Sequence, residues 1–63
     1  MRITLKAARI NKNLTQDEVA AKLNVTKKTV GSWESGKTMP KVDKIEPLCE
    51  LYGLTYENIA WNA

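Results

Sequence analysis

Two short helical segments joined by only three residues constrain the fold of this chain more than any other feature. The first segment reads "TQDEVAAKL", in which Thr15 lies three positions before Glu18. This spacing predicts a capping box, in which each side chain bonds a free backbone amide of the first helical turn. Val19, Ala20 and Leu23 then recur at helical spacing, so the helix has one apolar face.

The connection "NVT" leaves little freedom between this helix and the next. Asn24 tolerates the left-handed conformation that a tight helix exit requires, Val25 can turn inward, and Thr26 can cap the following helix through its hydroxyl. Helices joined so closely must cross steeply rather than lie antiparallel. The sequence therefore predicts a helix-turn-helix arrangement.

The segment from Thr26 to Glu34 has two unlike faces when it is drawn as a helix at about 100° per residue. Val30 and Trp33 fall on one side, which predicts contact with the core. The other side is basic, small and hydrogen-bonding, and it carries Lys27, Lys28, Gly31 and Ser32, with Thr29 at its margin. Trp33 can alternatively stack on single-stranded bases, but its position beside Val30 favours the core.

Gly31 is unusual in the middle of a helix, where glycine costs about 1 kcal/mol relative to alanine. A glycine on the outward side suits close approach to a neighbouring backbone or base edge, or is merely tolerated there. After this segment, Gly36 predicts a left-handed helix end, and Pro40 prevents the helix from resuming easily.

Three further helices are predicted around this pair. The first runs from about Thr4 to Lys12. The fourth begins with a second capping box, formed by Asp43 and Glu46, and ends at Gly53. Pro47 is expected to distort the first turn of this helix without breaking it.

A short last helix is predicted after Thr55, with Tyr56 or Ile59 buried. Trp61 either makes a satellite contact with the core or belongs to a surface that binds a partner. Together these five helices describe an all-α chain with one domain spanning residues 1–63.

A chain of 63 residues buries only about 60% of the surface that its unfolded form exposes, so its apolar residues are needed for the core. The chain has no histidine and a single cysteine, Cys49, which excludes a zinc site or a disulfide within one chain. It also lacks a glycine-rich phosphate loop, and we predict no enzyme activity, cofactor, metal or small-molecule substrate. No apolar run approaches the ~20 residues of a membrane span, so we predict a cytoplasmic protein.

Charge is distributed unevenly along the chain, whose net charge is +3. Residues 1–13 have four basic side chains and no acid, and residues 25–41 have four lysines against Glu34. Residues 42–63 have four acids against Lys44. This asymmetry indicates a basic face turned toward a polyanion, with a simple surface charge bias as an equal alternative.

The chain resembles the phage repressor and Cro-like (XRE-type) helix-turn-helix family in two runs, "LKAARINKNLTQDEVAAKLNVTKKTVGSWESGKTMPKV" and "LCELYGLTYENI". The resemblance covers nearly the whole chain, and "SWESGK" followed by Pro40 is its most specific part. It implies a compact five-helix lambda-repressor-like DNA-binding domain, whose second and third helices form the helix-turn-helix. In the known repressors the third helix lies in the major groove. Asn24, where glycine is frequent, and Pro47 depart from the family pattern.

The resemblance also implies roles for the polar residues around the third helix, about Lys27 to Glu34. Base edges would be read by residues on its outward side: Lys27, Lys28, Thr29 and Ser32. Phosphate oxygens would be held by residues at helix starts and beyond the third helix: Gln16, Thr26, Ser35, Lys37 and Lys41. Arg9 and Glu34 would form a structural ion pair.

The chemistry of these groups is consistent with that division. Lysine binds phosphate without reading sequence, whereas a side chain in the major groove meets a donor and acceptor pattern that differs for each base pair. Lys28 can donate to O6 and N7 of guanine, and Ser32 can donate or accept. Lys27 or Lys28 can instead contact phosphate alone, because the flexible lysine stem fixes its target less firmly than arginine does.

We therefore predict a sequence-specific transcriptional regulator, a repressor, that binds double-stranded DNA. A homodimer is expected at least on DNA, because one such module contacts only a short half-site. The alternative is a protein-interaction module, such as an antitoxin or adaptor domain, that binds a partner through Tyr56, Ile59 and Trp61.

Overall fold

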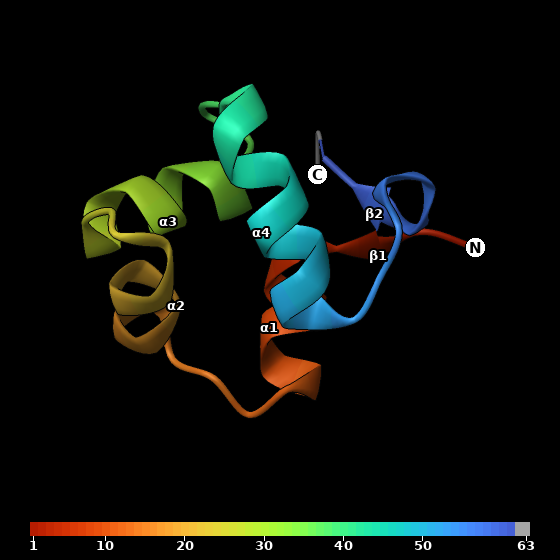
Figure 1. Cartoon of the computed structure of the whole chain (residues 1–63), viewed down its shortest axis with the longest axis horizontal. Helices are drawn as coiled ribbons and strands as arrows, with labels where there is room; N and C mark the ends of the chain where they lie inside the picture. The colour runs from red at the N-terminus through yellow and green to blue at the C-terminus, as the bar shows by residue number, and fades with distance from the viewer. Residues whose placement is uncertain (62–63) are drawn as a thin grey trace.

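The computed structural model describes residues 1–61, and this part of the chain contains four α-helices and a two-stranded sheet. The helices are α1 (Leu5–Asn11), α2 (Gln16–Leu23), α3 (Lys27–Glu34) and α4 (Val42–Tyr52). They are followed by a 3-10 turn, η1 (Tyr56–Asn58), and the strands are β1 (Ile3–Thr4) and β2 (Ile59–Ala60). α2 and α3 lie on one side of α4, and the paired strands lie on the other (Figure 1).

The core lies between the four helices and the strand pair, and every helix contributes to it. Its buried side chains are Leu5, Ala8, Val19, Ala20, Leu23, Val30, Trp33, Leu48, Tyr52, Ile59 and Trp61. The predicted apolar face of the second helix is therefore confirmed. Trp33 is only 5% exposed, so it anchors α3 to the core, and the alternative of a base-stacking role is wrong for this side chain.

The turn between α2 and α3 has the predicted local chemistry. Thr15 and Glu18 form the capping box, with the Thr15 amide donating to Glu18 Oε1 at 2.8 Å and the Glu18 amide donating to Thr15 Oγ1 at 3.1 Å. Asn24 has a φ of 57°, in the left-handed region. The Thr26 hydroxyl accepts from the Thr29 amide at 3.2 Å and so caps α3. These caps fix the start of α2 and the start of α3, and the short turn between the helices restricts the angle at which they cross.

The predicted start of the fourth helix is wrong. The capping box of Asp43 and Glu46 does not form, because α4 begins two residues earlier at Val42 with Lys41 as its N-cap. Asp43 then lies in the first turn, where its charge still favours the positive helix end. Pro47 becomes the sixth helical residue, yet the helix continues to Tyr52 as expected. Pro47 has no amide to donate, and its ring crowds the carbonyl of Asp43 four residues earlier, yet the other contacts of α4 offset these costs.

The predicted fifth helix is also wrong. Only three residues, Tyr56–Asn58, form a helical turn, with the Thr55 hydroxyl bonded to the Asn58 side chain. Ile59 and Ala60 then extend as β2 and pair in parallel with Ile3 and Thr4. An extended backbone lets the β-branched Ile59 side chain enter the core while its backbone groups bond β1. The fold is therefore predominantly helical rather than all-α.

Two of the three apolar side chains that the interaction-module hypothesis places at the surface are buried. Ile59 and Trp61 are 1% and 7% exposed, and the Trp61 indole donates to the Tyr56 carbonyl at 3.0 Å. Tyr56 alone of the three remains open, at 51% exposed. Trp61 is thus a core contact of this chain, and the proposed partner surface of Tyr56, Ile59 and Trp61 does not exist as one patch.

Tyr52 makes the stability of the fold sensitive to alkaline pH. Burial raises the pKa of Tyr52 to about 12, with a smaller rise from Glu34 and an opposing effect of Arg9. The unfolded phenol ionises near pH 10. The difference in free energy of unfolding between wild type and a Tyr52→Phe variant should be constant below about pH 10. Wild type should then lose stability relative to the variant as pH rises to about 12. Urea unfolding of both proteins across this range measures the difference, and parallel pH profiles would contradict it.

Candidate nucleic-acid interface

α3 presents a polar, basic side to solvent because its other side is locked into the core. Val30 is 1% exposed and Trp33 is 5% exposed, and both pack against the other helices. Lys27 and Lys28 on the opposite side are exposed, and Thr29 and Ser32 are half-buried at its edges. The two-faced helix expected from the sequence is therefore present.

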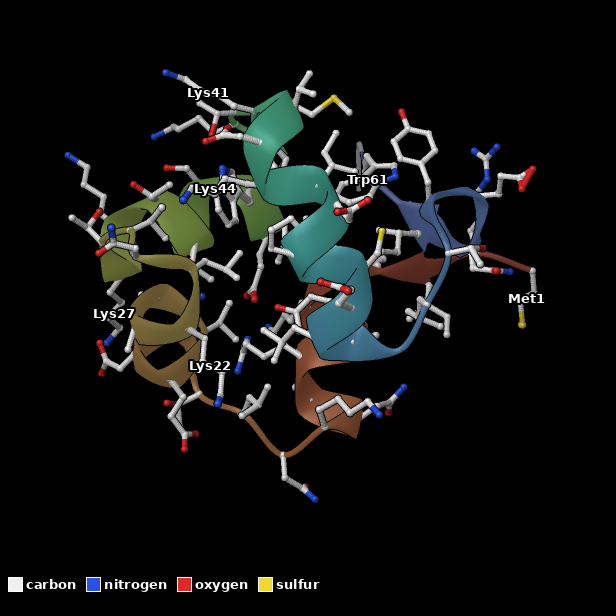
Figure 2. All side chains as sticks on the ribbon, in the orientation of Figure 1. Met1, Lys22, Lys27, Lys41, Lys44 and Trp61 are labelled. Atoms are coloured by element: carbon white, nitrogen blue, oxygen red, sulfur yellow. The ribbon has the colours of Figure 1, made fainter. Side chains whose placement is uncertain are left out.

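Three of the four candidate base-reading residues meet at one hollow. Lys28, Thr29 and Ser32 line a cavity of about 580 Å³ between α3 and the start of α4. Lys41, a candidate phosphate ligand, lines the same cavity from the α4 side. Lys41 lies at the start of α4, and Lys27 lies beside α2 (Figure 2). Lys28 and Lys41 therefore share one hollow, which Lys27 does not line.

Lys27 stands apart from that hollow. Its ammonium lies 4.0 Å from the carboxylate of Asp17, and both side chains are largely exposed. An exposed pair at this distance contributes little to stability, so it does not hold Lys27 in place. The Thr29 hydroxyl is more restricted, because it shares a hydrogen bond of 2.9 Å with the Thr26 hydroxyl. The fold therefore restrains the Thr29 hydroxyl more than the Lys27 ammonium.

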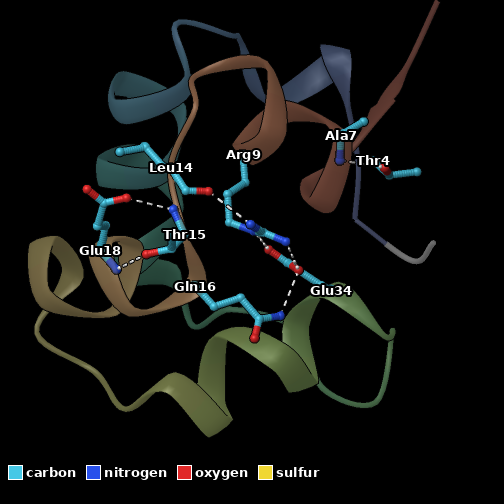
Figure 3. Close-up of polar contacts among 8 residues, drawn as sticks. All are labelled: Thr4, Ala7, Arg9, Leu14, Thr15, Gln16, Glu18 and Glu34. Atoms are coloured by element: carbon cyan, nitrogen blue, oxygen red, sulfur yellow. Dashed lines mark hydrogen bonds and ion pairs between the residues drawn. The ribbon is translucent and has the colours of Figure 1, made fainter.

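A half-buried ion pair connects α1 to the end of α3. Arg9 Nε donates to Glu34 Oε2 at 2.6 Å, and Arg9 Nη2 donates to Glu34 Oε1 at 3.2 Å (Figure 3). The third guanidinium nitrogen donates to the Leu14 carbonyl at 2.9 Å. The hydrogen bond to Glu34 is the main cause of a raised pKa of Arg9, against the opposing effect of burial. The pair ties the helix-turn-helix to the rest of the chain.

Gln16 belongs to this network in the free protein. Its side-chain amide donates to Glu34 Oε1 at 3.0 Å, so one of its donors is occupied within the fold (Figure 3). The Gln16 backbone amide remains at the first position of α2, where the positive helix end attracts anions. The structure therefore gives Gln16 a positioning contact that the resemblance did not imply.

The other candidate phosphate ligands occupy both ends of α3. Thr26 caps its start, while Ser35 and Lys37 follow its end on either side of Gly36, which has a φ of 78°. The Ser35 hydroxyl donates to the Ser32 carbonyl at 3.2 Å, and Lys37 is exposed. Polar groups thus flank the helix at its start and end, as a helix lying in a groove between two phosphate backbones requires.

Gly31 faces α2 rather than open solvent. A methyl group added there would lie 3.8 Å from Gln16 Nε2, which is an ordinary contact. Because nothing in the fold excludes a side chain, Gly31→Ala should raise the free energy of unfolding by about 1 kcal/mol. Chemical denaturation measures this change. A destabilised variant would show that the backbone at this position requires glycine.

Lys44 is a residue that sequence reasoning did not find. Its ammonium donates to the Leu23 carbonyl at 2.8 Å and so satisfies the C-terminal end of α2. The two residues are 21 positions apart, and nothing in the local pattern indicates that they meet. Lys44 fixes the start of α4, and with it Lys41, relative to the helix-turn-helix.

A helix-turn-helix family model matches residues 5–59, which include all four helices. The chain belongs to the helix-turn-helix family. The match runs from the first residue of α1 to the first residue of β2, so the family pattern covers both the α2–α3 pair and the elements that support it.

Two curated relatives share this helix-turn-helix region. The "HTH-type transcriptional activator BcrR" of Enterococcus faecalis is 31% identical over 55 residues, which cover 87% of this chain and 27% of the relative. The "Cryptic phage CTXphi transcriptional repressor RstR" of Vibrio cholerae is 34% identical over 50 residues, covering 79% of this chain and 45% of the relative. The chain thus spans less than half the length of either relative. No solved structure matches it.

Within residues 1–61, no group of histidine, cysteine and acidic side chains is placed to hold a metal ion. In the same part of the chain, no helix is long and apolar enough to cross a bilayer.

Proposed function

We propose that this chain is the DNA-binding domain of a transcriptional regulator and recognises specific sequences in duplex DNA. The observation that carries the proposal is the two-faced α3, whose apolar side is buried while Lys28, Thr29 and Ser32 surround an open hollow with Lys41. The names of both relatives, an activator and a repressor of transcription, support the same class. No catalytic step is part of the proposal.

Specificity and affinity come from different residues. Lys28 reads base edges by donating to O6 and N7 of guanine, and Ser32 and Thr29 add hydrogen bonds to neighbouring bases or phosphates. Lys37, Lys41 and the backbone amides at the starts of α2 and α3 hold phosphate oxygens and set the register of α3. Lysine contacts to phosphate release counterions, so binding weakens as salt increases.

The regulator acts as a repressor and as a homodimer on DNA. Occupying a promoter is enough to block transcription, whereas activation needs a further contact with the transcription machinery. A single α3 covers only a short half-site, and a twofold dimer doubles the sequence that is read. The two half-sites are then about 34–36 Å apart, which is one turn of the double helix.

Selection from a library of random DNA duplexes tests this function. The expected result is enrichment of an inverted repeat with half-sites one helical turn apart, bound less tightly as salt is raised. A reporter promoter with that repeat should then be less active when the protein is present. No enriched sequence, or a preference for single-stranded DNA, would contradict the proposal.

A further inference from the structure

A second hollow lies beside α3, between this helix and the starts of α1 and α2. Its volume is about 230 Å³, and it is lined by Lys6, Gln16, Gly31, Glu34 and Ser35. We refer to it as the Gly31 hollow. None of these five residues lines the larger hollow of Lys28 and Lys41. The helix α3 therefore borders two separate hollows, one toward α1 and α2 and one toward α4.

Gly31 leaves its hollow open although the fold does not require glycine there. Its φ is not in the left-handed region, and an added methyl group would lie 3.8 Å from Gln16 Nε2, which is an ordinary contact. Glycine in the middle of a helix lowers helix stability relative to alanine. The missing side chain thus lowers stability without a reason inside the fold, which indicates that a group from outside enters the hollow.

Lys6 is a second residue in this hollow that lowers the stability of its own helix. It lies in the first turn of α1, near the positive helix end, where a positive charge is unfavourable. The helices α2 and α4 have the favourable pattern, with Asp17, Glu18 and Asp43 in their first turns. Lys6 is exposed, and within residues 1–61 it forms no ion pair with a carboxylate. Its charge is therefore available to an anion from outside the chain.

The carboxylate that lines the Gly31 hollow is already neutralised. Glu34 Oε2 accepts a hydrogen bond from Arg9 Nε, and Glu34 Oε1 accepts from Arg9 Nη2 and Gln16 Nε2 (Figure 3). The Glu34 side chain is only 6% exposed. Because Arg9 balances the charge of Glu34, Lys6 determines the sign of the charge that the hollow presents, and the hollow attracts an anion.

We propose that the Gly31 hollow binds a phosphate group of the DNA backbone, with Lys6 as its cation and Gly31 as its open side. The inference rests on the proposed function, since the phosphate belongs to the DNA that α3 reads. A helix in the major groove lies between two sugar-phosphate backbones. Lys41 binds the backbone on the α4 side, and Lys6 binds the backbone on the side of α1 and α2. Gln16 and Ser35, already assigned to phosphate on this side, are neutral, so Lys6 adds the charge that they lack.

Replacing Lys6 with glutamine tests the cation. Glutamine is a good helix former without charge, so the variant should be at least as stable to urea as wild type. At about 0.1 M salt it should bind the selected duplex and a scrambled duplex roughly tenfold more weakly, and the slope of log affinity against log salt should decrease by about 1. Lys6→Arg should bind as wild type does, because the charge is kept.

Lys22→Gln is the matched control for net charge. Lys22 is exposed in the last turn of α2 and does not line the Gly31 hollow. Its replacement removes one positive charge, as Lys6→Gln does, but should leave the affinity for DNA and its salt dependence unchanged. If Lys22→Gln and Lys6→Gln weaken binding equally, a general effect of charge explains both and the Lys6 contact is wrong.

Replacing Gly31 with alanine tests the opening, because stability and affinity should change in opposite directions. The variant should unfold at a higher urea concentration than wild type, yet bind both duplexes several-fold more weakly, since the methyl group narrows the hollow. A loss of affinity caused by a damaged fold would be accompanied by a loss of stability. A more stable variant that binds DNA as tightly as wild type would overturn the role of Gly31.

Neutral methylphosphonate groups, placed one at a time in the selected duplex, locate the phosphate. Wild type should lose affinity at a backbone position where Lys6→Gln loses none, because the charge pair is already absent in the variant. Equal losses for the two proteins at every position would overturn the contact while leaving the DNA-binding function intact. If wild type has no salt-dependent affinity for any duplex, the proposed function is wrong, and the phosphate contact is wrong with it.

Discussion

Replacing Glu34 with alanine is expected to lower the free energy of unfolding by about 3 kcal/mol. The Glu34 side chain is 6% exposed and accepts hydrogen bonds from both Arg9 and Gln16. Its removal leaves Arg9, whose side chain is only 12% exposed, without its counter-charge. A domain of this size has a small margin of stability, so a substantial fraction should be unfolded at 37 °C. Circular dichroism during urea titration measures the loss.

The control for this experiment replaces both members of the pair. Arg9→Met combined with Glu34→Leu fills the same space with apolar side chains and leaves no unpaired charge. This double variant should recover most of the stability lost in Glu34→Ala. A double variant as unstable as the single one would show that the network stabilises the fold through more than the cost of an isolated charge.

Replacing Lys28 with alanine is expected to weaken binding to the selected DNA sequence by about 2 kcal/mol, or roughly 30-fold. The side chain is exposed, so the fold should be unaffected. Binding to a scrambled duplex should change much less, because the lost contacts are those to a base. Fluorescence anisotropy with labelled duplexes measures both affinities, and repetition of the selection should show a relaxed preference at one position.

Lys41→Ala is the matched control, because Lys41 lies across the same hollow but is assigned to phosphate. Its loss should weaken binding to selected and scrambled sequences alike and reduce the slope of log affinity against log salt by about 1. If both variants weaken all sequences equally, the assignment of Lys28 to base reading is wrong.

The parts of the fold that could be predicted depend on neighbouring residues. The capping box of Thr15 and Glu18, the left-handed Asn24 and the buried Trp33 all follow from patterns within one helix or turn. Such patterns act over three or four residues, so a single sequence is enough to find them.

The errors lie where distant contacts outweigh local preference. Asp43 and Glu46 have the spacing of a capping box, but the Lys44 bond to Leu23 fixes the start of α4 against α2, and the helix begins earlier. Thr55 is a residue type that favours the start of a helix, yet Ile59 pairs with Ile3, 56 positions away, and forms a strand. The local periodicity of the sequence predicts neither of these contacts.

The candidate DNA interface shows the same limit. The wheel position of Lys28 and Ser32 predicted that they would share one side of α3, and they line one hollow. The bond between Gln16 and Glu34 joins residues 18 positions apart, and only the folded chain reveals it. Placing residues on a helix face is thus possible from sequence, whereas assigning their partners is not.

The central claim is that the outward side of α3 enters the major groove of duplex DNA. Backbone amide chemical shifts of the ¹⁵N-labelled chain, recorded as the selected duplex is added, test it most directly. The largest changes should fall in residues 26–32, with further changes near Lys37 and Lys41. Changes confined to η1 and β2, with residues 26–32 unaffected, would contradict the claim.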